Sequence, residues 1–162
     1  MLKSKKIVLV GHFGVGKSSL IRRYVQNVFS DDYFVTVGVH IVKKVVQVNN
    51  QELTLLIWDI EGKEDMKKLR PSFLLGTSGF IYVLDASRPS TYEILEDELD
   101  FIRTNYPKTE LVTVANKIDL VDKESFIATL GEKAPWITHF SSAKTGECVE
   151  LLFEKLAHTL VQ

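Results

Sequence analysis

The first residues of this chain whose types and spacing could do chemistry are Gly11-His-Phe-Gly-Val-Gly-Lys17-Ser18. An apolar run at 7–10 precedes them, and a segment with helical spacing follows from Ser19. Strand, glycine loop and helix form the context of a phosphate-binding loop, in which backbone N–H groups surround phosphate oxygens at a helix N-terminus. We expect Lys17 to bridge the outer phosphates and the Ser18 hydroxyl to bind Mg²⁺. A chance match in a glycine turn is the alternative, and the flanking elements argue against it.

This loop predicts a set of nucleotide contacts. Glycine lets the backbone approach a phosphate closely, because it has no side chain to collide with the ligand. The helix N-terminus adds the positive end of its dipole. We therefore expect phosphate contacts from Gly14, Val15, Gly16, Lys17, Ser18 and Ser19.

A second polar segment, Asp59-Ile-Glu-Gly62, directly follows the apolar run at 55–58. A carboxylate at this point can hold Mg²⁺ through water, opposite Ser18. The backbone N–H of Gly62 would then lie close to a third phosphate. Alone, Asp-x-x-Gly is typical of a turn, but its position after a strand in a chain with a phosphate loop favours the metal-binding interpretation.

The segment Asn116-Lys117-Ile-Asp119 indicates the base. A carboxylate in the plane of guanine accepts hydrogen bonds from both N1–H and the 2-amino group, whereas adenine leaves it unpaired. The Lys117 stem can lie over the ring. A surface turn would be the default interpretation in a chain without the phosphate loop. The short run Ser142, Ala143, Lys144 would add contacts to the base.

Apolar runs and amphipathic segments alternate along the whole chain. We expect strands at 6–10, 39–48, 53–59, 80–85, 111–116 and 136–140, and helices at 17–25, 66–74, 91–105, 123–130 and 148–160. Asn49-Asn50 suits a tight hairpin between the second and third strands. Ser90, with Glu93 three residues on, predicts a capping box that opens the third helix.

These elements predict an α/β fold in one domain, residues 1–162. Alternating strands and helices indicate a mostly parallel sheet, and uninterrupted apolar strands such as 80–84 indicate a sheet with helices on both faces. We expect six strands, mixed through the one antiparallel hairpin. Ligands of such sheets bind beyond the carboxyl ends of the strands. All four polar segments follow strands, so they should meet at one edge.

Bulk properties exclude several classes of protein. The 162 residues carry a net charge of −1, without the basic excess of a nucleic-acid-binding protein. A single cysteine, Cys148, excludes an internal disulfide and favours a reducing compartment. The sequence shows no signal peptide, no membrane-spanning run and no lipidation motif, since residue 2 is Leu and the last five residues lack cysteine. We therefore expect a cytoplasmic protein without a visible lipid anchor.

Together these motifs resemble the small GTPases of the Ras superfamily, and the Rab branch most of all. The resemblance includes Tyr-Phe-Val-Thr-Val-Gly-Val at 33–39 and Pro-Ser-Phe at 71–73, and it covers essentially the whole chain. It implies the P-loop NTPase G-domain fold and a monomeric switch that binds GTP or GDP with Mg²⁺ and hydrolyses GTP. It also implies that Thr36 ligates Mg²⁺, that Phe29 packs on guanine and that Tyr33 covers the phosphates. Effectors and regulators would bind switch regions 30–40 and 59–75.

The chain departs from this family at three positions. Lys63 stands where the family has the glutamine that orients the attacking water, and lysine has no hydrogen-bond acceptor. Phe13 stands where a small residue is usual, and Glu61 where alanine is usual. The resemblance thus implies Lys17, Thr36, Gly62 and Lys63 as the residues acting in a slow hydrolysis.

Three alternatives remain open. The protein could be a GTP-binding interaction module that does not hydrolyse GTP, as Phe13 and Lys63 would favour. It could be the GTPase domain of a larger protein. An ATP-specific P-loop enzyme is the least favoured, because Asp119 argues against adenine.

Overall fold

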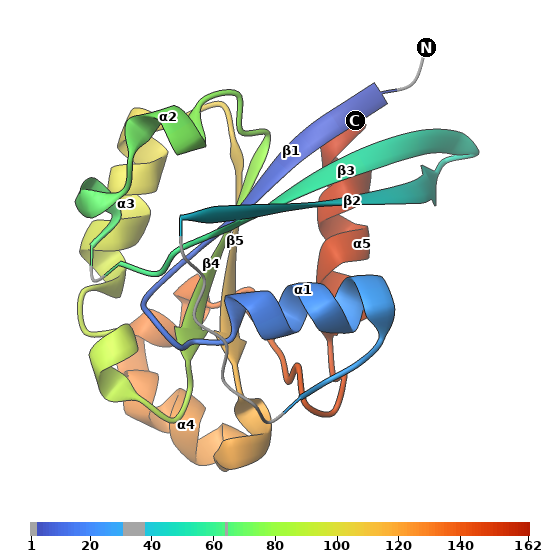
Figure 1. Cartoon of the computed structure of the whole chain (residues 1–162). Coiled ribbons are helices and arrows are strands. Elements are labelled where there is room, and N and C mark those ends of the chain that lie inside the picture. Colours follow the sequence, from blue (N-terminus) through green and yellow to red (C-terminus); the bar gives the residue numbers. More distant parts are fainter. Residues whose placement is uncertain (1–2, 31–37, 64) are drawn as a thin grey trace.

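The sheet that positions the four polar segments is the centre of the molecule. A computed structural model describes residues 3–30, 38–63 and 65–162. Within these ranges six strands form one sheet in the order β2-β3-β1-β4-β5-β6 (Figure 1). They are β1 (Lys3–Val10), β2 (Val39–Val48), β3 (Gln51–Ile60), β4 (Gly79–Asp85), β5 (Glu110–Asn116) and β6 (His139–Phe140). The β2–β3 pair is antiparallel and the other pairs are parallel, as the sequence predicted.

The hairpin between β2 and β3 forms at the predicted dipeptide. Asn49 and Asn50 both have positive φ, 50° and 61°. Two consecutive left-handed residues build the tight turn whose twist matches that of the flanking strands, and asparagine tolerates this conformation.

Helices cover both faces of the sheet. In the described part of the chain they are α1 (Lys17–Gln26), α2 (Pro71–Leu74), α3 (Leu95–Asn105), α4 (Lys123–Leu130) and α5 (Val149–Leu160). Side chains of α1 and α5 form one apolar core with the sheet, and side chains of α2, α3 and α4 form a second core on the other face (Figure 1). All seven residues of β4 are buried, because this strand lies between the two cores. The predicted fold class is therefore confirmed.

Two of the expected elements are shorter than the sequence suggested. The helix expected at 66–74 is a 3₁₀ turn at Met66–Lys68 followed by α2, and Arg70 between them is extended. Pro71 explains this break, because proline disfavours helical geometry at the residue before it. The strand expected at 136–140 is reduced to β6, because a 3₁₀ helix with Pro135 inside it occupies Gly131–Trp136.

The capping box expected at Ser90 was wrong. Residues Pro89–Thr91 form a 3₁₀ turn, and α3 begins only at Leu95 without a side-chain cap. The cause is Thr91, which is fully buried beside the end of β4. Its hydroxyl accepts a hydrogen bond from the backbone N–H of Asp85 and donates to the carbonyl of Arg88. This turn fixes the position of the residues that follow β4.

Candidate nucleotide-binding site

A cavity of about 260 Å³ lies at the carboxyl edge of the sheet, where β1, β3, β5 and β6 end. It is lined by the glycine loop, the first turn of α1 and the loops that follow the other strands. Twelve predicted site residues line it, namely Gly14, Gly16, Lys17, Ser18, Ser19, Phe29, Gly62, Asn116, Lys117, Asp119, Ala143 and Lys144. One edge of the sheet thus brings together segments from residue 14 to residue 144.

The glycine loop is built for close backbone approach. Gly16 has φ +101° and forms the N-cap of α1, and a Cβ at this position would lie 2.3 Å from the Asn116 side-chain nitrogen. A Cβ at Gly11, with φ +144°, would lie 2.2 Å from the Val83 carbonyl oxygen. Any other residue at these two positions would collide with its neighbours, and the left-handed backbone there favours glycine as well.

The segment Asn116–Asp119, which the sequence predicts as the base-recognition segment, is hydrogen-bonded directly to the glycine loop. The Asn116 side-chain nitrogen donates to the Val15 carbonyl at 3.0 Å, and Lys117 Nζ donates to the Gly14 carbonyl at 2.8 Å. Asn116 Oδ1 also accepts a hydrogen bond from the Ala143 backbone N–H at 3.3 Å. Asn116 is almost fully buried, so these bonds hold three separate loops in one arrangement.

Asp119 is oriented from behind. The Ser142 hydroxyl donates to Asp119 Oδ1 at 2.7 Å, which leaves the carboxylate as an acceptor beside the cavity. Ser142 itself is fully buried, so it acts on Asp119 and does not line the cavity. Val15 is likewise buried, so only its backbone could contact a phosphate.

Lys17 is buried at the bottom of the glycine loop. Its Nζ donates to the carbonyls of Gly11 at 3.2 Å and His12 at 3.0 Å. Burial lowers the pKa of Lys17 to about 8; the nearby Asp59 carboxylate opposes this shift, and the positive charge of Arg88 adds to it. Burial removes the water that would stabilise the charged ammonium. A bound anion would offset this loss, because a nearby negative charge favours the protonated lysine.

Ser18 and Asp59 converge from α1 and β3. The Ser18 hydroxyl donates to Asp59 Oδ2, and Asp59 is only 4% exposed. These two side chains offer hard oxygen ligands at one point next to the expected phosphates. Mg²⁺ is commonly bound by one or two protein oxygens together with substrate phosphates, so the residues present fit this ion.

The segment that follows β3 meets the glycine loop at Gly62. A Cβ on Gly62 would lie 2.7 Å from both the N and Cα atoms of Phe13, so only glycine fits there. The Phe13 side chain is half exposed at the rim of the cavity. Lys63 lies outside the cavity lining, and its Nζ is 3.4 Å from Glu61 Oε2. Tyr33 and Thr36 lie outside the described residues.

Three supporting residues were not predicted from the sequence. Asp85, fully buried at the end of β4, binds Lys117 Nζ at 3.0 Å, and Arg23 on α1 donates from Nε to the Ala143 carbonyl at 2.8 Å. Arg88 donates to the Phe13 carbonyl at 2.8 Å. Asp85 could have been found, because it ends a strand at the same edge of the sheet. Nothing in the local sequence indicates the contacts of Arg23 and Arg88.

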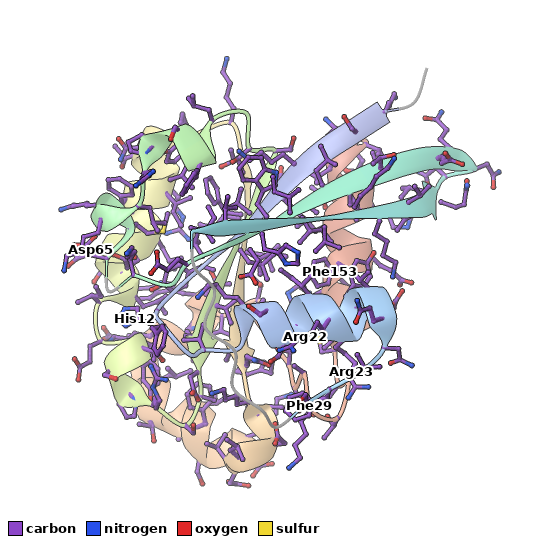
Figure 2. All side chains as sticks on the ribbon, viewed as in Figure 1. His12, Arg22, Arg23, Phe29, Asp65 and Phe153 are labelled. Atoms are coloured by element: carbon purple, nitrogen blue, oxygen red, sulfur yellow. The ribbon has the colours of Figure 1, made fainter. Side chains whose placement is uncertain are left out.

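Figure 2 shows Arg22 and Arg23 on α1 and Phe29 in the segment that follows this helix. Arg22 and Phe29 line the cavity, whereas Arg23 holds the loop that contains Ala143. The cavity also contains Ser30, Ile60 and Leu120, which no sequence pattern indicated.

Comparison with known proteins identifies relatives over nearly the whole chain. The sequence model of the Ras family matches residues 6–162. The Ras-related protein Rab-18-B of Danio rerio is 33% identical over 168 residues, which covers 100% of this chain and 82% of the relative. Rab-18 of Lymnaea stagnalis is 33% identical, with 100% and 83% covered, and Rab-18 of Caenorhabditis briggsae is 34% identical, with 99% and 82% covered.

Proposed function

The chain belongs to the Ras family as a Rab-like small GTPase, a switch that binds GTP and hydrolyses it, and from this premise we propose which of its residues perform each task. The observation that carries the proposal is the hydrogen bonding of Asn116 and Lys117 to the glycine loop. These bonds unite a base-binding loop and a phosphate-binding loop in one cavity, as a nucleotide requires.

The phosphates would bind to the glycine loop. Backbone N–H groups from Gly14 to Ser19 and the dipole of α1 favour negative charge there. Lys17 would leave the carbonyls of Gly11 and His12 and bridge the outer phosphates. Gly62, which already contacts the backbone of Phe13, would bring its N–H to the third phosphate and so make switch II sensitive to its presence.

The guanine base would bind between the two remaining loops. Asp119 would accept its N1–H and 2-amino hydrogens, with the carboxylate held in orientation by Ser142. The stem of Lys117 would lie over the ring, and Phe29 would pack against it. Contacts from Ala143 and Lys144 would complete the base site, and Asn116 would hold the loops together.

Mg²⁺ would be held by Ser18 and Asp59, with Thr36 as a further ligand in the GTP state. The contact between the Ser18 hydroxyl and the Asp59 carboxylate supports this assignment. When bound, the ion would neutralise charge on the outer phosphates during hydrolysis. The protein itself contributes the buried Lys17 ammonium and the orientation of the glycine loop.

Hydrolysis should be slow without a partner protein. Lys63 has no acceptor for a hydrogen from the attacking water, and its ammonium lies beside the Glu61 carboxylate. We propose that the Lys63–Glu61 pair replaces the usual glutamine only in part, with Glu61 as the acceptor and Lys63 as a source of positive charge.

Regulators and effectors would bind switch regions 30–40 and 59–75. We propose that the protein acts as a monomer and that it resides in the cytoplasm. The single cysteine supports the second proposal, because it favours a reducing compartment. None of the described helices has both the length and the apolar character needed to cross a bilayer.

The nucleotide that the protein retains through purification tests this proposal. Chromatography of the denatured protein should release GDP or GTP in an amount close to one per chain. Retention of adenine nucleotides instead, or equal affinity for ATP and GTP, would contradict the assignment of the base site.

A further inference from the structure

Three side chains donate hydrogen bonds to consecutive carbonyls of the glycine loop. Arg88 donates to the Phe13 carbonyl at 2.8 Å, Lys117 to the Gly14 carbonyl at 2.8 Å and Asn116 to the Val15 carbonyl at 3.0 Å. Three consecutive peptide groups therefore have a donor on their oxygen, and two of these donors are cations. Lys117 and Asn116 belong to the base-recognition segment, whereas Arg88 belongs to no recognised motif.

A donor on a peptide oxygen also changes the N–H of the same peptide. The carbonyl oxygen and the next residue's N–H share one delocalised planar group, and they point in opposite directions when the peptide is trans. A charged donor on the oxygen polarises the group and makes the N–H a stronger donor. The peptide that Arg88 contacts carries the N–H of Gly14, which lines the cavity.

We propose that Arg88 is a positioning residue for GTP hydrolysis, which fixes and polarises the Phe13–Gly14 peptide so that the Gly14 N–H serves the phosphates. The inference rests on the proposed function, since it requires that the glycine loop binds phosphate. It adds a residue outside the recognised motifs to the phosphate site and states how that residue acts.

The backbone of Arg88 is held rigidly. Its N–H donates to the Asp85 carbonyl at 3.0 Å, and its own carbonyl accepts the buried Thr91 hydroxyl at 2.8 Å. The same Asp85 binds Lys117 through its carboxylate. One turn after β4 therefore positions Arg88 and Lys117, the two cations that donate to the Phe13 and Gly14 carbonyls. The same turn explains why α3 begins later than the sequence predicted, because Thr91 belongs to the turn and not to the helix.

The charge of Arg88 also reaches the phosphate site itself. It is one of the charges that act on the Lys17 ammonium, alongside the opposing carboxylate of Asp59. Negative phosphates in the cavity would be attracted by the same guanidinium. Replacing the arginine with a neutral donor should therefore weaken both the local hydrogen bond and the field at the site.

Single-turnover GTP hydrolysis with Mg²⁺ tests the inference in four variants. Arg88→Ala removes the donor, Arg88→Gln keeps a neutral donor and Arg88→Lys keeps the charge. Arg103→Ala is the matched control, because Arg103 is an exposed arginine on α3 that pairs with Asp100 at 3.7 Å. We expect Arg88→Ala and Arg88→Gln to slow hydrolysis by about 3- to 10-fold, because a hydrogen bond to a charged group makes a modest net contribution. Arg88→Lys should retain more activity than Arg88→Gln, and Arg103→Ala should match the unmodified protein.

The amide resonance of Gly14 in the GDP-bound protein separates positioning from a general structural role. Its proton signal should shift upfield in Arg88→Ala and Arg88→Gln and should stay in place in Arg103→Ala, because polarisation of that one peptide is lost. If Arg88→Ala fails to fold, Arg88→Gln alone provides the neutral variant for both measurements. Hydrolysis in both neutral variants equal to that of Arg103→Ala would overturn the inference, whatever the amide signal does. Failure of the unmodified protein to bind GDP would instead overturn the proposed function.

Discussion

At the scale of single residues, we propose that Lys63 limits the rate at which the protein hydrolyses GTP. Glutamine both accepts and donates hydrogen bonds, whereas an ammonium only donates, so Lys63 cannot accept a hydrogen from the water. The Glu61 carboxylate lies 3.4 Å from its Nζ and is itself part exposed. An exposed pair of this kind is weak and leaves both side chains free to reorient. The proposed slow rate follows from the loss of water positioning, on which in-line attack depends.

We expect intrinsic hydrolysis no faster than that of Ras, roughly 3–5 × 10⁻⁴ s⁻¹. Lys63→Gln should raise the rate, and the double variant Phe13→Gly with Lys63→Gln should raise it further, because it also removes bulk at the rim of the cavity. A single-turnover assay with γ-labelled GTP measures both changes. A fast unmodified protein that Lys63→Gln slows would make Lys63 catalytic in its own right and would overturn this account.

The sequence predicted the residues that line the cavity far better than those that support them. Lys17, Asn116 and Asp119 belong to short segments whose spacing reflects the ligand. Arg23 and Arg88 act through contacts with residues 120 and 75 positions away, and no local pattern records such pairs. The roles given to Tyr33 and Thr36 remain predictions, because these residues lie outside the described part of the chain.

At the scale of secondary-structure elements, α3 holds the middle of switch II, the region 59–75, through one carboxylate. The backbone N–H of Met66 lies 3.0 and 3.2 Å from the two carboxylate oxygens of Glu98, which is 4% exposed. Burial raises the pKa of Glu98 to about 7, and the neighbouring Asp65 adds to this shift. The hydrogen bond from the Met66 N–H lowers the pKa and so offsets part of it. The Lys67 charge also lowers this pKa, and Tyr82 on β4 faces the same carboxylate. Switch II is therefore coupled to α3 by a group that titrates near neutral pH.

The pH dependence of stability tests this coupling. Because the folded state holds the Glu98 proton more tightly than the unfolded chain, this group lowers the unfolding free energy as pH rises from about 4.5 to about 7. Glu98→Gln cannot titrate, so it should lose less stability than the unmodified protein between pH 5 and pH 7.5. Urea unfolding at both values measures the difference, with Asp97→Asn on the exposed side of α3 as the control. Parallel pH profiles for Glu98→Gln and the unmodified protein would contradict the coupling.

The hydrophobic periodicity of the sequence located the helices and strands well, but it did not locate the points where a helix is interrupted or begins late. The interruption at Arg70 and the late start of α3 depend on Pro71 and on the buried Thr91 hydroxyl. Proline was visible in the sequence, so the first break could have been predicted. The second could not, because it depends on the burial of Thr91 beside the end of β4, which no local pattern shows.

At the scale of the whole molecule, two apolar cores on opposite faces of one sheet hold the site together. The core beneath α1 and α5 includes a stacked pair, Tyr24 and Phe153, with ring centroids 4.0 Å apart. This pair fixes α1, whose first turn we propose to hold the phosphates, against the C-terminal helix. The sequence predicted this architecture because strands buried on both faces and alternating helices leave few other topologies.

Phe153→Ala should therefore lower the unfolding free energy by about 3–5 kcal/mol, the usual loss when a buried aromatic is truncated. Leu151→Ala on the exposed side of α5 is the control and should have little effect. Urea unfolding in the presence of GDP and Mg²⁺ measures both. A small loss for Phe153→Ala would show that α1 does not depend on α5 for its position.

The central claim is that one cavity binds guanine through Asp119 and phosphate through the glycine loop. The most direct measurement is the affinity of the unmodified protein and of Asp119→Asn for GTP and xanthosine triphosphate. Xanthine has an oxygen where guanine has the 2-amino group, so it needs a donor where Asp119 offers an acceptor. We predict that Asp119→Asn weakens GTP binding and strengthens xanthosine triphosphate binding, so that the preference reverses. An unchanged preference for GTP in Asp119→Asn would contradict the account.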